Sequence, residues 1–119
     1  DGEARATVVS WYLAHARARV GHRVAHFAPL VGAAPAAVVV RDLGRHRWGT
    51  CHSRTRTVTF HWELILQPPE ILDYVVVHEL THLHAPDHGP GFWRRVESVL
   101  PDWKRRRAWL SGHGQRHVV

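Results

Sequence analysis

The chain has 119 residues, of which 45% are hydrophobic and 22% are charged. This composition excludes intrinsic disorder and favours a single folded domain over residues 1–119. No apolar run reaches the roughly 18 residues of a membrane helix, so we expect no membrane contact, and no secretory signal is recognisable. The formal net charge is +6, which favours an acidic or polyanionic partner, although a merely solvated basic surface explains it equally well.

Counts of three other residue types bear on the cellular compartment, on the N-terminus of the chain and on the weight of any histidine motif. A single cysteine, Cys51, excludes an intrachain disulfide and favours a reducing compartment, so we expect a cytoplasmic protein. Methionine is absent, and we therefore expect the chain to be truncated at its N-terminus. Histidine occurs 12 times, so any histidine motif must be weighed against a raised rate of chance matches.

The N-terminal region, residues 1–30, is predicted to be a helix. Apolar side chains recur there at steps of three and four residues and share one face. They are Val9, Leu13, Ala16, Val20, Val24 and Phe27. Gly21 is a point at which the helix could break, and Pro29 is expected to open a loop.

Residues 36–63 are predicted to form a small, mostly antiparallel sheet of about three strands. The first strand is the β-branched run 37–41, and segments 48–52 and 57–62 have strand character. The basic linker 53–56 would join the last two as a hairpin. We therefore expect an α+β fold, with this sheet packed against the helices that follow.

Residues 68–110 are predicted to be helical, with prolines at the breaks. The expected helices span about 69–84, 90–100 and 102–110. The tail 111–119 is expected to fray.

The first of these helices is apolar nearly all round, which is typical of a buried helix. Into it the sequence places His78, Glu79 and His82, in the pattern HExxH. Residues four apart lie about 40° apart round the axis, so the two histidines can converge on one Zn²⁺. Glu79, about 100° further round, can reach a water on the metal. Two ligands and a general base are the parts of an HExxH zinc hydrolase.

A third ligand is needed, because in so histidine-rich a chain the motif arises by chance in roughly one case in twenty. His84 lies about 200° from His82 and would face away from the metal. His88 lies beyond the break at Pro86, where the chain can fold back. The spacing between His82 and His88 equals that in the metzincin pattern HExxHxxGxxH. However, Ala85 stands where that pattern has glycine, and the chain has no methionine, so a metzincin is disfavoured.

Several segments have a familiar order along the chain. They are His46-Arg47-Trp48-Gly49-Thr50-Cys51, Leu64-Ile65-Leu66, Asp73–Leu80, His88-Gly89 and Phe92-Trp93. In this order they resemble the YgjP-like metallopeptidases, which are relatives of the SprT-like zinc proteases within the gluzincin-type group. The resemblance covers roughly residues 41–112.

The resemblance implies that His78, His82 and His88 bind zinc and that Glu79 is the catalytic base. It also implies that the strand at 48–52 flanks the cleft. Members of this family carry a β-rich segment before the first helix, which agrees with the expected truncation. Where they have asparagine, an aromatic and a basic residue, this chain has His-Trp-Glu at 61–63, a change that would alter the substrate wall.

Other residues near the motif are candidates for supporting roles at the site. Tyr74, four residues before His78, is a candidate oxyanion stabiliser or a packed core tyrosine, and His61 is a second candidate for the same role. Asp87 and Glu97 are candidates for orienting a metal-bound imidazole.

Two further features of the sequence each have a structural and a functional interpretation. Cys51 is more simply a small strand residue than a nucleophile. The run Lys104–Arg107 is either a solvated helix face or a phosphate-binding patch.

We interpret the chain as a zinc-dependent hydrolase, and most simply as a metallopeptidase, with an extended peptide paired to an exposed strand edge. One alternative is a metal-dependent nucleotide phosphoanhydride hydrolase of the pyrophosphatase type, with arginines holding the phosphates. Another is a catalytically idle, zinc-containing nucleic-acid-binding module. Glu79 argues against the second alternative, because a structural zinc site needs no base.

Overall fold

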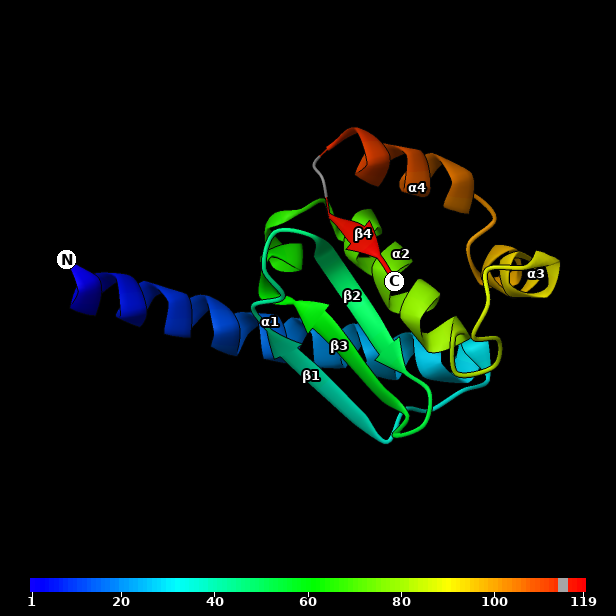
Figure 1. Ribbon diagram of the computed structural model, residues 1–119, viewed down its shortest axis with the longest axis horizontal. Helices are drawn as coiled ribbons and strands as arrows, with labels where there is room; N and C mark the ends of the chain where they lie inside the picture. Colours follow the sequence, from blue (N-terminus) through cyan, green and yellow to red (C-terminus); the bar gives the residue numbers. More distant parts are fainter. Residues whose placement is uncertain (114–115) are drawn as a thin grey trace.

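The structure, a computed structural model, describes residues 1–113 and 116–119. Three strands follow one another after the first helix, and three α-helices follow those strands, an order that confirms the predicted α+β class (Figure 1). In chain order they are α1 (Gly2–Val31), β1 (Ala37–Arg41), β2 (Arg47–His52), β3 (Thr57–His61), the 3-10 helix η1 (Trp62–Leu66), α2 (Pro69–Thr81), α3 (Pro90–Val99), α4 (Trp103–Gly112) and β4 (His117–Val118).

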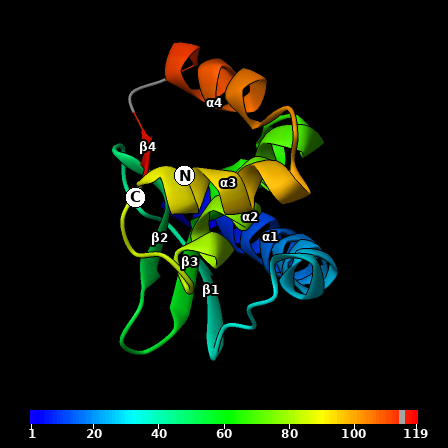
Figure 2. The ribbon, with the colours of Figure 1, turned by 90° about the vertical axis from the view of Figure 1, so that its right-hand side faces the viewer.

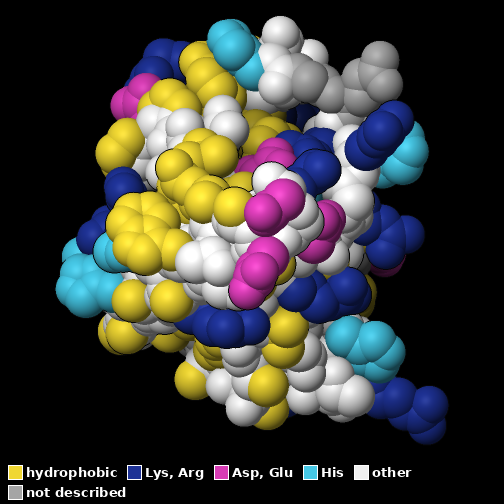
Figure 3. Space-filling view, turned by 90° about the vertical axis from the view of Figure 1, so that its left-hand side faces the viewer, with side chains coloured by type: hydrophobic (Ala, Val, Ile, Leu, Met, Phe, Trp, Pro, Cys, Tyr) yellow, Lys and Arg dark blue, Asp and Glu magenta, His cyan; other side chains and the backbone are white. Residues whose placement is uncertain are grey.

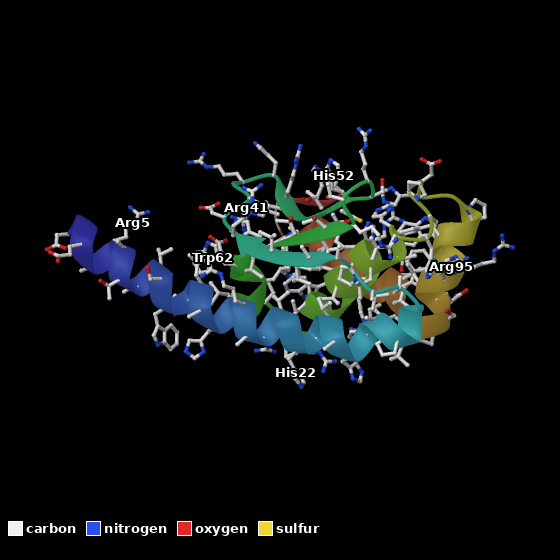
Figure 4. The ribbon with its side chains drawn as sticks, turned by 90° about the horizontal axis from the view of Figure 1, so that it is seen from below. Arg5, His22, Arg41, His52, Trp62 and Arg95 are labelled. Carbon is white, nitrogen blue, oxygen red and sulfur yellow. The ribbon has the colours of Figure 1, made fainter. Side chains whose placement is uncertain are left out.

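Helix α1 is continuous through Gly21 and Pro29 and ends at Gly32, whose φ of 76° lies in the left-handed region that glycine tolerates. Its buried residues are Ala16, Val20, Val24 and Phe27. They are the C-terminal part of the predicted apolar face. The first turns extend past the sheet, and Figure 4 shows Arg5 there and His22 on the side of the helix turned away from the strands.

The four strands form one mixed sheet in the order β1-β3-β2-β4. The predicted hairpin of β2 and β3 is confirmed, but β1 pairs with β3 in parallel and β4 pairs with β2 in parallel. The sheet is therefore not the mostly antiparallel one expected. Strand β3, whose Val58 and Phe60 are apolar and fully buried, lies between β1 and β2. Strand β1 is exposed at three of five positions, as suits a strand at the edge of the sheet.

Helix α2 lies at the centre of the molecule. It contacts α1, β2, α3 and α4, and Figure 2 shows α1 and α2 on the same side of the strands. A bidentate ion pair of Arg23 with Asp73, at 2.8 and 3.0 Å, ties α1 to α2. Burial on all sides explains why the sequence of α2 is apolar nearly all round.

Helix α2 ends earlier than predicted, at Thr81 rather than near His84. The N–H of His84 donates to the carbonyl of Thr81 at 2.9 Å, so the chain tightens into a turn before Pro86. This turn starts the loop that carries His88 back toward α2.

The C-terminal tail also differs from the expected frayed segment. Helix α4 reaches Gly112, and residues 117–118 form β4; the expectation for Gly114 and Gln115 falls outside the described residues. Within the ranges 1–113 and 116–119, none of the helices is long and apolar enough to cross a membrane.

Candidate active site

Three histidine side chains converge at the C-terminal end of α2. His78 and His82 come from successive turns of the helix, and His88 comes from the loop before α3. The Nε2 atom of His88 lies 3.2 Å from Nε2 of His78 and 2.9 Å from Nε2 of His82. One ligand atom from each residue lies within 4.8 Å of the others, so a single metal ion fits between them.

Contacts behind the rings fix their orientation. The Nδ1–H of His82 donates to the carbonyl of Ala85 at 3.1 Å, which leaves the lone pair of its Nε2 free to face the cluster. Phe92 of α3 packs against all three imidazoles, with ring centroids 4.6–5.0 Å apart. A backbone carbonyl and an aromatic wall therefore hold the rings in place.

Burial keeps the two helix histidines uncharged. It lowers the pKa of His78 well below its usual value, and the neighbouring His82, His88 and Arg107 act in the same direction. Burial also lowers the pKa of His82. Neutral imidazole is the form that binds a metal.

Glu79 is fully buried next to the cluster, facing β2. Neither carboxyl oxygen has a hydrogen-bond partner among residues 1–113 and 116–119, and burial raises the pKa of this carboxyl well above its usual value. A Cβ atom on Gly49 would lie 3.1 Å from Cγ and Oε2 of Glu79. Gly49 therefore gives Glu79 its space, a role that sequence reasoning missed; the available signal was a glycine inside a strand.

Cys51 lines a cavity of about 160 Å³ beside the cluster. His82, Pro86, His88 and Val119 are among the other lining residues. Burial, together with the charge of Glu79, raises the pKa of the Cys51 thiol to about 11. A thiol that stays protonated at neutral pH agrees with the prediction of a small strand residue and not with a nucleophile.

The two predicted candidates for oxyanion stabilisation differ in position. Tyr74 is buried with its ring centroid 5.9 Å from that of His78, and burial raises its pKa to about 12. It also lines a second cavity of about 190 Å³ together with Arg107 and Arg116. Tyr74 thus lies next to the histidine cluster and keeps a proton to donate.

His61 is a structural residue. Its Nδ1 accepts from the N–H of Glu63 at 3.1 Å, and its Nε2–H donates to the carbonyl of Gly44 at 3.1 Å. Because both ring nitrogens are engaged, His61 caps η1 instead of serving the cleft.

The remaining candidates form no hydrogen bond with the cluster in the described part of the chain. His84 is turned away as predicted, and its Nε2–H donates to the carbonyl of Val31 at 3.1 Å. The side chains of Asp87 and Glu97 form no hydrogen bond or ion pair with any residue of the described ranges, although burial, which lowers the pKa of His82, is partly offset by the charge of Asp87. The carbonyl of Ala85, not a carboxylate, orients the His82 imidazole.

The basic run Lys104–Arg107 is partly neutralised. Arg105 and Arg106 pair with Asp102 at 2.7 and 2.9 Å, and Arg105 also approaches Glu70 at 3.5 Å. The pairings with Asp102 favour a solvated surface over a phosphate-binding patch at this run. On the face shown in Figure 3, lysine and arginine side chains are dispersed among apolar and acidic ones.

Strand β4 lies along the edge of β2 that borders the cluster. The N–H of His117 donates to the carbonyl of His46 at 2.6 Å, and the N–H of Val119 donates to that of Gly49 at 3.2 Å. An extended chain therefore fits beside β2, over α2 (Figure 1). The sequence did not predict this occupant, because two residues of β4 carry too little pattern.

Three histidines converge beside a buried glutamate in an α+β fold, with an extended segment paired to the neighbouring strand β2. This is the arrangement of a metal-dependent hydrolase. Comparison with known proteins names the family: the chain belongs to the YgjP-like metallopeptidases, whose metallopeptidase domain it matches over residues 2–113. The match includes α1, which lay outside the expected resemblance. The predicted family and the predicted metallopeptidase class are confirmed.

Two solved structures are similar to this chain. The metallopeptidase zymogen abylysin of Pyrococcus abyssi is 27% identical, with a TM-score of 0.75 over 84% of this chain and 99% of that chain. The metallopeptidase zymogen jannalysin of Methanocaldococcus jannaschii is 13% identical, with a TM-score of 0.68 over 78% of this chain and 94% of that chain, and shares the fold. No curated protein matches the chain.

Proposed function

We propose that the chain is a zinc-dependent peptidase in which His78, His82 and His88 hold the metal. The observation that carries the proposal is the approach of their Nε2 atoms to 3.2 and 2.9 Å. Two nitrogens bound to one tetrahedral zinc, each at about 2.0–2.1 Å, lie about 3.3 Å apart. Three imidazoles with an open fourth position form a catalytic zinc site, whereas a structural site is closed by four protein ligands.

Glu79 is the proposed general base. When bound, zinc polarises the scissile carbonyl and makes water nucleophilic near neutral pH. The Glu79 carboxylate accepts the proton of the attacking water and passes it to the leaving amine. A nearby cation favours the charged carboxylate, which offsets the effect of burial on its pKa.

The substrate is proposed to be an extended peptide paired with the edge of β2 that β4 occupies in this structure. The carbonyls of His46 and Gly49 already accept backbone N–H groups from β4, and a peptide backbone offers the same donors. Tyr74 is the proposed donor to the developing oxyanion, a role supported by the 5.9 Å between its ring centroid and that of His78.

A cytoplasmic location, in a reducing environment, is also proposed. The free thiol of Cys51 supports it.

The experiment uses three substrates in parallel: a casein-like protein, a nucleoside triphosphate and labelled DNA, each with and without a chelator. Protein cleavage that stops with the chelator and returns with zinc is the expected result. Hydrolysis of the triphosphate alone would instead establish the phosphoanhydride alternative. Retention of DNA with no hydrolysis of either substrate would establish the binding module.

A further inference from the structure

The side chain of Arg116, at the start of the segment beside β2, lies in a set of contacts that matches a guanidinium group. Its Nη1 donates to Oε2 of Glu63 at 2.6 Å, and its Nε donates to the carbonyl of Gly44 at 3.0 Å. Its guanidinium carbon lies 4.7 Å from the ring centroid of Trp48. Carboxylate, carbonyl and aromatic face are the three groups that a planar cation with several donors satisfies together.

Two of these three groups, the Gly44 carbonyl and the Trp48 ring, are held in place by contacts other than those with Arg116. His61 donates to the carbonyl of Gly44 and accepts the backbone N–H of Glu63, so one buried imidazole fixes that carbonyl and the backbone from which the Glu63 carboxylate extends. The Trp48 side chain belongs to the core, with only 3% of the residue exposed. A site whose carbonyl and ring stay in place when its occupant leaves can accept another occupant of the same chemistry at little cost.

We propose that Glu63, Trp48 and the carbonyl of Gly44 form a subsite for an arginine side chain of the peptide substrate, which Arg116 occupies in this structure. The inference rests on the proposed function, because it concerns what the cleft beside β2 accepts. A lysine engages the subsite less fully than an arginine, since its single ammonium cannot make the two directed contacts and stack on the ring at once.

The subsite lies at a defined distance from the histidine cluster. Arg116 precedes Val119 by three residues, and Val119 lines the same cavity as His82 and His88. Three residues of extended chain span about 10 Å. We therefore expect the preferred arginine about three residues from the scissile bond, on one side of it only.

The test uses fluorogenic peptides that are neutral except for one arginine, moved stepwise from four residues before to four residues after the scissile bond. Matched peptides carry glutamine in its place. Because Arg116 competes for the subsite, the Arg116→Ala protein is the reference. Glu63→Gln is introduced into it, and Glu3→Gln, at the far end of α1, is the matched control that removes a charge elsewhere.

In the Arg116→Ala protein we expect kcat/KM for one arginine position to exceed that of its glutamine peptide by at least about tenfold, the size of one charge-assisted contact. Adding Glu63→Gln should bring this ratio close to one, and adding Glu3→Gln should leave it unchanged. A ratio near one at every position in Arg116→Ala, or a preference that survives Glu63→Gln, would overturn the subsite and make the Arg116–Glu63 pair a purely structural contact.

A binding measurement separates this inference from the proposed function. Fluorescence anisotropy of the same peptides with the Arg116→Ala, Glu79→Gln protein reports affinity without turnover. Tighter binding of the arginine peptide, lost on adding Glu63→Gln, supports the subsite even if no peptide is cleaved by any variant. Equal affinity for the arginine and glutamine peptides contradicts the subsite, whatever the peptidase assay shows.

Discussion

Gly49 and Glu79 are so close that a side chain at position 49 would require its neighbours to shift. An added Cβ would meet Cγ and Oε2 of Glu79, and Cγ1 of Val75, at 3.1 Å. Val75 and Glu79 are both fully buried in α2. The Glu79 carboxyl group lies at the end of a longer side chain than Cγ1 of Val75, so we expect this carboxyl group to shift.

The substitution Gly49→Ala should accordingly impair catalysis. We expect peptide hydrolysis to fall severalfold, by up to about tenfold, because a Cβ at 3.1 Å displaces the carboxyl by less than the roughly 1 Å that costs about a hundredfold. Overpacking should also lower the free energy of unfolding by about 1–3 kcal/mol. Steady-state kinetics and urea denaturation measure the two effects.

Gly21→Ala is the matched control. A Cβ on Gly21 meets nothing within 4 Å, so activity should be unchanged and the helix should gain about 0.5–1 kcal/mol. Full activity in Gly49→Ala would show that the close approach does not position Glu79.

The buried carboxyl of Glu79 predicts a pH-dependent stability of the metal-free protein. Its pKa is raised well above the usual 4.5 by burial, so between 4.5 and the raised value the folded state binds more protons than the unfolded state. Stability is therefore lost as pH rises through this window. Glu79→Gln, which cannot ionise, should be more stable than the wild type at pH 8.5, and the difference should shrink toward pH 4.5.

Urea denaturation of both proteins in the presence of a chelator, at several pH values, gives this difference. Comparing the two proteins cancels the contributions of the histidines. A difference that is constant across the range, or one that grows as pH falls, would mean that Glu79 is ionised and satisfied in the metal-free fold.

At the scale of elements, the site combines a helix with a loop. The sequence predicts the positions of ligands on the helix well, but for the loop it could only reject His84 as a ligand. His78, Glu79 and His82 are fixed by the period of α2, a local property. The position of His88 follows from the early end of α2 and the turn before Pro86, and those depend on the backbone bonds after Thr81. Sequence reasoning could reject His84 by its angle but could not measure the return of His88.

The strand order was beyond prediction for a related reason. The β-branched residues of β1 and β3 indicate strands but not which strand edges pair. The short β4 is recognised only through its partners on β2. Gly49 and the subsite around Trp48 were missed because each depends on elements that are distant along the chain.

A pair of substitutions tests the role of the loop. His88→Ala should weaken zinc binding sharply, because it removes one of three ligands, whereas His84→Ala should leave it unchanged, because that imidazole bonds the carbonyl of Val31. Zinc content after dialysis and competition with a chelating dye measure the difference. Equal loss in both variants would contradict the proposed ligand set.

At the scale of the whole molecule, the structure bears on the choice among three functions: a peptidase, a phosphoanhydride hydrolase and a nucleic-acid-binding module. The net charge of +6 suggested a polyanion, but the run at 104–107 is partly paired with Asp102 and Glu70. The cleft beside β2 instead accepts an extended chain through backbone hydrogen bonds. The family and the geometry agree on a metallopeptidase.

The most direct test of this account compares zinc content and peptide hydrolysis in the wild type and in Glu79→Gln. The glutamine keeps the size of the side chain but cannot accept the proton of water. We predict about one zinc per chain in both proteins and a loss of turnover of at least about 10²–10⁴-fold in the variant. Loss of zinc from Glu79→Gln would make Glu79 a ligand, and undiminished hydrolysis with zinc retained would contradict the proposed mechanism.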